Sequence, residues 1–89
     1  MLQATLPIIN KLGLHARAAA KFIDVTSAHG AKIRVRLGSR AADGKSIMGV
    51  MMLGARMGTS IDVEIDGEDE AAMLEALSAL LANRFGEGE

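Results

Sequence analysis

One of the two histidines, His15, directly precedes a predicted helix and stands two residues before an arginine. The sequence there reads GLHAR over residues 13–17. The first amides of a helix lack partners within it, and together with the helix dipole they favour a bound anion. An unperturbed imidazole is largely neutral at physiological pH and nucleophilic, and Arg17 can donate paired hydrogen bonds to phosphoryl oxygens. These residue types indicate phosphoryl transfer through His15, although a histidine in this position is more often a cap or a surface residue.

The elements that must position His15 follow from the spacing of the apolar residues. Alternation predicts strands, which we expect over residues 2–9, 32–37, 40–42 and 61–66. Apolar residues at helical spacing predict three helices, which we expect over residues 16–27, over residues 47–53 and from Asp69 or Glu70 onward. The buried stripe of the last helix is formed by Met73, Leu74, Leu77, Leu80 and Leu81. The tail, residues 86–89, is expected to be loose.

The resulting order, β-α-β-β-α-β-α, predicts a single α+β domain over residues 1–89, with all three helices on one face of the sheet. Pro7 cannot donate to a strand ladder, so the first strand is expected at a sheet edge. The other face is expected to be solvated, because its residues are charged. The basic residues Lys32, Arg34 and Arg36 would lie beside the acidic residues Asp62, Glu64 and Asp66 and form cross-strand ion pairs.

The composition limits the class of protein. There is no cysteine, which excludes disulfides and thiolate metal sites. No signal peptide and no apolar run long enough to cross a membrane are present, so we expect a cytoplasmic protein without membrane insertion. Residues 1–58 contain nine Lys and Arg side chains and two acids, whereas residues 59–89 contain one Arg and nine acids. The basic part suggests an anionic ligand or an acidic partner.

The short helix predicted over residues 47–53 combines an N-cap with a cluster of methionines. Ser46 precedes it, and a serine hydroxyl at this position accepts a hydrogen bond from a helix amide. So short a helix cannot bury all its apolar side chains, and exposed methionine suits a surface that meets several partners. We therefore expect an exposed docking patch near His15. It would consist of Ile47, Met48 and Met51, bordered by Leu14, Ala20 and Lys21.

Two separate motifs resemble those of the HPr family of bacterial phosphotransferase phosphocarriers. GLHAR at residues 13–17 resembles its active-site motif, and KSIMGVM at residues 45–51 resembles its regulatory-serine segment. The sequence GEDE at residues 67–70 is also familiar from family members. The two motifs have the family's separation, and the resemblance covers essentially the whole chain. It implies an open-faced β-sandwich whose four antiparallel strands have the order 1-4-2-3.

The resemblance also implies the roles of the site residues. His15 would accept a phosphoryl group through Nδ1 from phospho-enzyme I, which phosphoenolpyruvate charges, and pass it to an enzyme IIA protein or domain. Arg17 would contact the phosphoryl group, and Ser46 would be phosphorylated by HPr kinase/phosphorylase. One position departs from the family pattern, because Ala18 stands where proline is usual. Alanine keeps the helix, but the geometry around His15 could be looser and transfer slower.

Other classes of function remain open from the sequence. The chain would be a transfer intermediate rather than a stand-alone enzyme, and by default a monomer. The alternative is a regulatory binding protein of a nitrogen-linked phosphotransferase chain, with little or no sugar transport. A nucleic-acid-binding domain is disfavoured because aromatic residues for base stacking are missing. His15 and His29 lack metal-ligand spacing with acids and no nucleotide-binding glycine loop occurs, so we expect neither a metal nor a cofactor.

Overall fold

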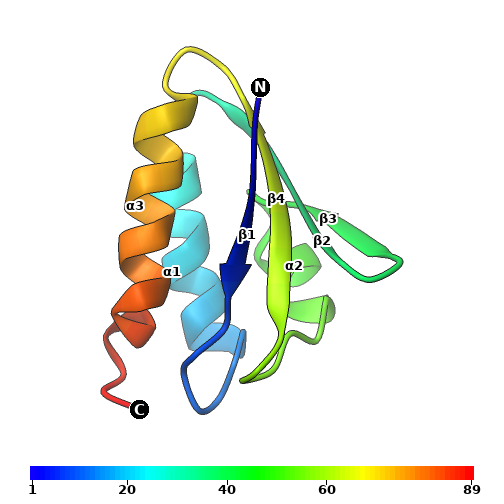
Figure 1. Ribbon diagram of the computed structural model, residues 1–89, viewed down its shortest axis with the longest axis vertical. Coiled ribbons are helices and arrows are strands. Elements are labelled where there is room, and N and C mark those ends of the chain that lie inside the picture. Colours follow the sequence, from blue (N-terminus) through cyan, green and yellow to red (C-terminus); the bar gives the residue numbers. More distant parts are fainter.

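The computed structural model describes residues 1–89 and shows an open-faced sandwich, with a four-stranded antiparallel sheet covered on one face by three helices (Figure 1). The strands are β1 (Leu2–Pro7), β2 (Lys32–Leu37), β3 (Arg40–Asp43) and β4 (Ser60–Asp66). The helices are α1 (Ala16–Ser27), α2 (Ile47–Met52) and α3 (Glu70–Ala82), followed by a single turn, η1 (Arg84–Gly86). The predicted α+β class and element order are confirmed, with bounds that differ by one or two residues where the elements fray.

The strand order is β1-β4-β2-β3, as predicted. Pro7 lies on β1, which pairs only with β4 and is therefore an edge strand. A two-residue turn at Gly38 and Ser39 joins β2 to β3. Gly38 has a φ of 62°, the left-handed conformation that tight hairpin turns require and that glycine adopts without a steric cost. The hairpin thus fixes the register of β3 on β2.

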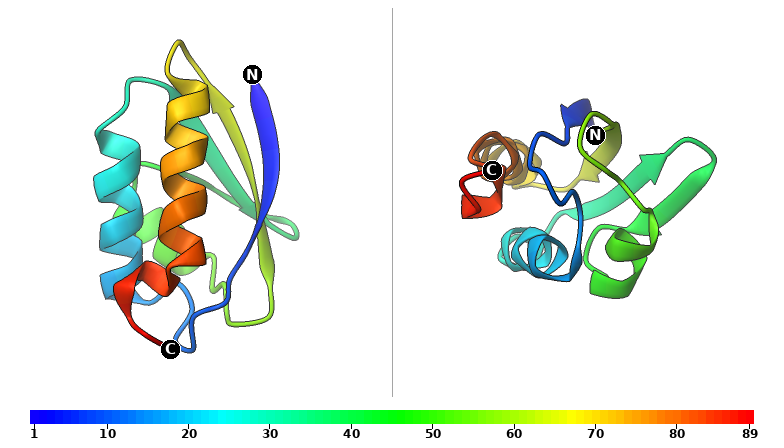
Figure 2. Two further views of the ribbon diagram at one scale, coloured as in Figure 1. Left: turned by 60° about the vertical axis from the view of Figure 1, so that its left-hand side comes forward. Right: turned by 90° about the horizontal axis from the view of Figure 1, so that it is seen from below.

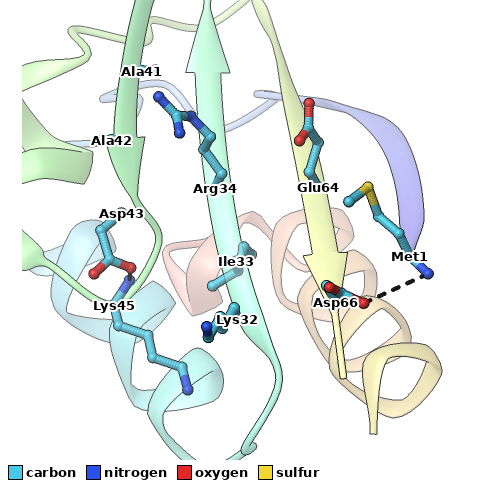
Figure 3. Close-up of a pocket in the computed structure, with 10 residues that line it drawn as sticks. All are labelled: Met1, Lys32, Ile33, Arg34, Ala41, Ala42, Asp43, Lys45, Glu64 and Asp66. Atoms are coloured by element: carbon cyan, nitrogen blue, oxygen red, sulfur yellow. Dashed lines mark hydrogen bonds and ion pairs between the residues drawn. The ribbon is translucent and has the colours of Figure 1, made fainter. Parts of the chain in front are cut away.

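The uncovered face of the sheet carries the expected rows of opposite charge, but few ion pairs form there. Lys32, Arg34 and Arg36 lie directly opposite Asp66, Glu64 and Asp62 in the register of β2 on β4. Only Arg36 and Glu64 come within ion-pair distance, at 3.9 Å. Figure 3 shows that Asp66 instead points to the amino group of Met1, 3.7 Å away. Solvated charges gain little from pairing, so the rows favour one register without locking their side chains together.

The core lies between the sheet and the helices. Phe22 of α1, Val35 of β2, Ile65 of β4 and Leu77 of α3 are each fully buried there. The predicted stripe of α3 is largely confirmed, because Met73, Leu77 and Leu81 are buried, while Leu74 and Leu80 are partly buried against the same core. None of the helices is both long and apolar enough to cross a membrane.

The C-terminal tail is ordered against the rest of the chain, and the expectation of a loose tail is wrong. After α3 the backbone turns sharply at Arg84 and Phe85, with φ angles of 54° and 55°. Left-handed backbone costs a non-glycine residue about 1–2 kcal/mol. The side chain of Phe85 is 1% exposed, and burial of an aromatic ring offsets such a cost. The turn directs the tail beside the segment that precedes α1 (Figure 2).

Candidate functional site

The start of α1 is fixed by the turn that precedes it. Gly13 has a φ of 66° and packs so closely that a Cβ there would lie 2.4 Å from the carbonyl oxygen of Ala55. Only glycine fits such a position. The next residue, Leu14, is 3% exposed and donates its backbone N–H to the same oxygen at 3.0 Å. This double anchoring places His15 directly before the first residue of α1, with its side chain partly exposed.

His15 is the N-cap residue of α1, and its side chain does not cap the helix. Its backbone is extended, with φ −73° and ψ 178°, and its carbonyl accepts the first helical bond from Ala19 at 2.8 Å. The amides of Ala16, Arg17 and Ala18 have no hydrogen-bond partner in the chain. They are the unpaired amides that make a helix start attractive to anions. The helix begins normally with Ala18 in its first turn, as expected for a strong helix former.

The imidazole of His15 is held by the tail. Its Nε2 contacts a carboxylate oxygen of Glu87 within hydrogen-bond distance. The other carboxylate oxygen of Glu87 accepts a hydrogen bond from Nδ2 of Asn10 at 2.8 Å. The same Nδ2 also donates to the carbonyl oxygen of Gly13 at 2.8 Å. Nδ1 of His15 makes no hydrogen bond in the chain, so one ring nitrogen is engaged and the other is available.

Glu87 is a well-supported carboxylate, although it lies only two positions before the last residue. Burial acts to raise the pKa of Glu87, but hydrogen bonds from Asn10 and His15 and the positive charge of Lys21 outweigh it and hold that pKa below its usual range. The side chain is 12% exposed and that of His15 29% exposed. Glu87 is therefore ionised at neutral pH and can accept a hydrogen bond from the ring.

A depression of about 610 Å³ opens beside His15. Three cationic side chains line it, from Lys11, Arg17 and Lys21, and the acids Glu87 and Glu89 lie at its tail side. Arg17 is exposed and forms no ion pair or hydrogen bond within the chain. Its guanidinium is thus available to a ligand at the start of α1, whereas Lys21 donates to the carbonyl oxygen of Phe85 at 2.6 Å.

Neither Asn10 nor Glu87 is marked as a member of this site by its place in the sequence. Asn10 is fully buried in the turn before α1, and Glu87 lies 72 residues after His15. One signal was present in the sequence. Phe85 is one of only two aromatic residues, and an aromatic side chain shortly after the last helix indicates an anchored segment rather than a loose one.

Ser46 lies at the start of α2 and acts as its N-cap, as predicted. Its hydroxyl oxygen accepts a hydrogen bond from the amide of Gly49 at 3.0 Å. Ile47 and Met48, the first two residues of the helix, are 45% and 62% exposed. Because α2 packs against α1, these apolar side chains lie on the helix that neighbours the one bearing His15.

The predicted docking patch needs a correction at Leu14. This residue belongs to the buried core and lies beneath the surface, because its side chain anchors the turn before α1. Met51, Ala20 and Lys21 are each partly exposed, and Met51 also packs against the core. Met52, which we did not include, is 67% exposed. No group of three or more His, Cys, Asp or Glu side chains is arranged to hold a metal ion.

Comparison with known proteins decides the family. A family model described as "PTS HPr component phosphorylation site" matches residues 2–83, which include His15 and the start of α1. The chain belongs to the HPr family of phosphocarrier proteins of the phosphotransferase system. The tail that carries Glu87 lies beyond the matched residues.

Individual HPr proteins resemble this HPr-family chain throughout. The phosphocarrier protein HPr of Cupriavidus necator is 52% identical over 89 residues, which is 100% of both chains. The crystal structure of HPr-C-His from Thermoanaerobacter tengcongensis has a TM-score of 0.93 at 39% identity and covers 98% of each chain. A crystal structure of an HPr dimer from the same organism gives a TM-score of 0.77 at 39% identity, over 98% of this chain and 100% of the other.

Proposed function

We propose that His15 accepts a phosphoryl group from phospho-enzyme I and passes it to an enzyme IIA protein or domain. The observation that carries this proposal is the position of the imidazole at the start of α1, beside three unpaired backbone amides and an unengaged guanidinium. A transferring phosphoryl group spreads its negative charge over three equatorial oxygens. Amides and a guanidinium are the donors that such a group requires.

The chemical step needs one ring nitrogen with an available lone pair. Nδ1 of His15 has no partner in the chain, and Nε2 is engaged by Glu87. The Nδ1 lone pair attacks phosphorus, the bond from phosphorus to the donor nitrogen breaks, and its electron pair returns to the donor. In the second transfer a histidine of enzyme IIA attacks phosphorus, the bond from phosphorus to Nδ1 of His15 breaks, and its electron pair returns to Nδ1. The chain is in this scheme a transfer intermediate and not a stand-alone enzyme.

Regulation through Ser46 is a second part of the proposal. Ser46 is half-buried at the start of α2, next to the exposed Ile47 and Met48. A phosphate there is compatible with the helix, because negative charge at a helix N-terminus is favourable. It would act on docking, since it places charge beside an apolar surface. HPr kinase/phosphorylase is the proposed modifying enzyme, and the proposed working form is a cytoplasmic monomer.

The decisive experiment is phosphorylation with enzyme I and phosphoenolpyruvate. We expect one acid-labile, base-stable phosphate on the wild-type protein and none on His15→Ala. His29→Ala is the matched control, because His29 binds the carbonyl oxygen of Val25 at the other end of α1 and should remain a full acceptor. Labelling of the His15→Ala protein, or loss of labelling in His29→Ala alone, would refute the assignment. Release of the label to an added enzyme IIA tests the second half of the transfer.

A further inference from the structure

The tail residue Glu87 contacts the reacting side chain from the edge opposite to the available nitrogen. Its two carboxylate oxygens are divided between Nε2 of His15 and Nδ2 of Asn10. Asn10 is fully buried and its amide is fixed a second time on the carbonyl oxygen of Gly13. The buried turn that contains Asn10 therefore fixes the carboxylate of Glu87. The carboxylate, for its part, fixes the imidazole of His15.

The position of the carboxylate is supported by the rest of the tail. Phe85 is buried in the core, and its carbonyl oxygen accepts a hydrogen bond from Lys21 of α1. The backbone amide of Lys11 donates to the carbonyl oxygen of Glu89 at 3.0 Å. Contacts on both sides of Glu87 thus tie the tail to the turn before His15 and to the helix after it. The contact between Glu87 and His15 therefore does not depend on one exposed side chain.

We propose that Glu87 is a positioning residue for phosphoryl transfer: its carboxylate accepts the Nε2 proton of His15 in a hydrogen bond, so that Nδ1 is the nitrogen presented to the donor. This inference rests on the proposed role of His15. An ionised carboxylate is only an acceptor, so the ring must carry its proton on Nε2 to satisfy it. The same arrangement of carboxylate and imidazole fixes the tautomer of the general base in serine proteases.

The carboxylate also acts on the charge that the reaction creates. When the Nδ1 lone pair bonds to phosphorus, the ring keeps its Nε2 proton and becomes positively charged. Glu87 then faces an imidazolium across a hydrogen bond between opposite charges, which is shorter and stronger than a neutral one. Such an interaction strengthens as the reaction proceeds, and only interactions of that kind accelerate the chemical step.

The first test reads the ring without any phosphorylation. In nitrogen-15 NMR at a pH where the imidazole is neutral, we expect wild-type His15 to be a single tautomer protonated on Nε2. Glu87→Ala should give a mixture of the two tautomers, and Glu89→Ala should match the wild type. Glu89→Ala is the control because it removes an equal charge from the same tail. The carboxylate of Glu89 pairs with Lys11 and not with His15. A single, unchanged tautomer in Glu87→Ala overturns the proposal.

The second test is the rate of phosphorylation by phospho-enzyme I. At saturating acceptor we expect Glu87→Ala to react about tenfold more slowly, the scale on which orienting carboxylates act on a histidine, with the half-saturating concentration unchanged. Glu87→Gln replaces the charge and one of the two acceptor oxygens with an amide donor, so it should also lose rate and should no longer hold a single tautomer. Equal rates for Glu87→Ala and wild type, or an equal loss in Glu89→Ala, overturn the positioning role. If the wild-type protein takes no phosphate on His15, the proposed function itself fails, and the tautomer measurement still judges the contact.

Discussion

Nζ of Lys21 lies 2.6 Å from the carbonyl oxygen of Phe85, so the helix that begins after His15 also binds the end of the chain. This contact joins residues 64 positions apart. It lies where the backbone leaves the core and turns toward His15. The start of α1, the turn before it and the tail are thereby one connected unit.

The Lys21 contact should contribute measurably to stability. We expect Lys21→Met, which keeps the aliphatic stem, to lower the free energy of unfolding by about 1 kcal/mol, the typical net value of an intramolecular hydrogen bond. Urea denaturation measures it. Lys11→Met is the matched control, because its ion pair with Glu89 at 3.9 Å is exposed and such pairs contribute little. Equal effects of the two substitutions would contradict the prediction.

Asp69 should make stability depend on acid pH. Its carboxylate accepts the amides of Gly30 and Ala31, both at 2.8 Å. The hydrogen bond from Gly30, opposed by burial and assisted by the one from Ala31, holds the pKa of Asp69 below its ordinary value of 3.8. A carboxyl whose pKa is lower in the folded state contributes stability above its unfolded-state pKa, and that contribution is lost as pH falls through the folded-state pKa.

We therefore expect Asp69→Asn to be less stable than the wild type at pH 7. The difference should begin to shrink near pH 3.8 and disappear once the pH has fallen through the lower pKa of the folded state. Urea denaturation across this range provides the measurement. Glu68→Gln, an exposed neighbour without a hydrogen bond, should follow the wild-type curve. A difference between Asp69→Asn and wild type that persists at low pH would show that the carboxylate charge is not the cause.

Ser46 should separate the role of the cap from the role of charge. Ser46→Ala removes the acceptor for the Gly49 amide and should cost about 1 kcal/mol of stability. Ser46→Asp and Ser46→Asn both retain a capping oxygen, and only the first adds charge. We expect Ser46→Asp alone to be phosphorylated by enzyme I about tenfold more slowly, which corresponds to about 1.4 kcal/mol. Similar rates for all three variants would remove Ser46 as a regulatory switch.

The exposed part of α2 should contribute to partner binding. Met48 is 62% exposed, so Met48→Asp should leave stability unchanged within about 0.5 kcal/mol. Binding to enzyme I should weaken about tenfold or more, because a charge would have to be desolvated at an apolar contact. Titration calorimetry measures both enzyme I and enzyme IIA binding. The control Ala72→Asp lies exposed in the first turn of α3, where an acid is tolerated; equal weakening there would argue against a local patch.

The sequence by itself determined the elements, their order and the position of the candidate nucleophile. Alternation in β2 and β4 and helical spacing in α1 and α3 are local patterns, and the register places the opposite charges of Arg34 and Glu64 side by side as expected. The GLHAR segment places an imidazole, helix amides and a guanidinium together through neighbouring residues alone. Such features depend on backbone geometry over a few positions.

Only the tertiary structure decided what surrounds the imidazole. The contact of Glu87 with His15 spans 72 residues and exists because burial of Phe85 reverses the chain after α3. Burial likewise removed Leu14 from the surface, since the turn at Gly13 directs its side chain into the core. Long-range packing of this kind leaves no periodic signal in the sequence, because the residues that meet are chosen by the shape of the whole core and not by their neighbours along the chain.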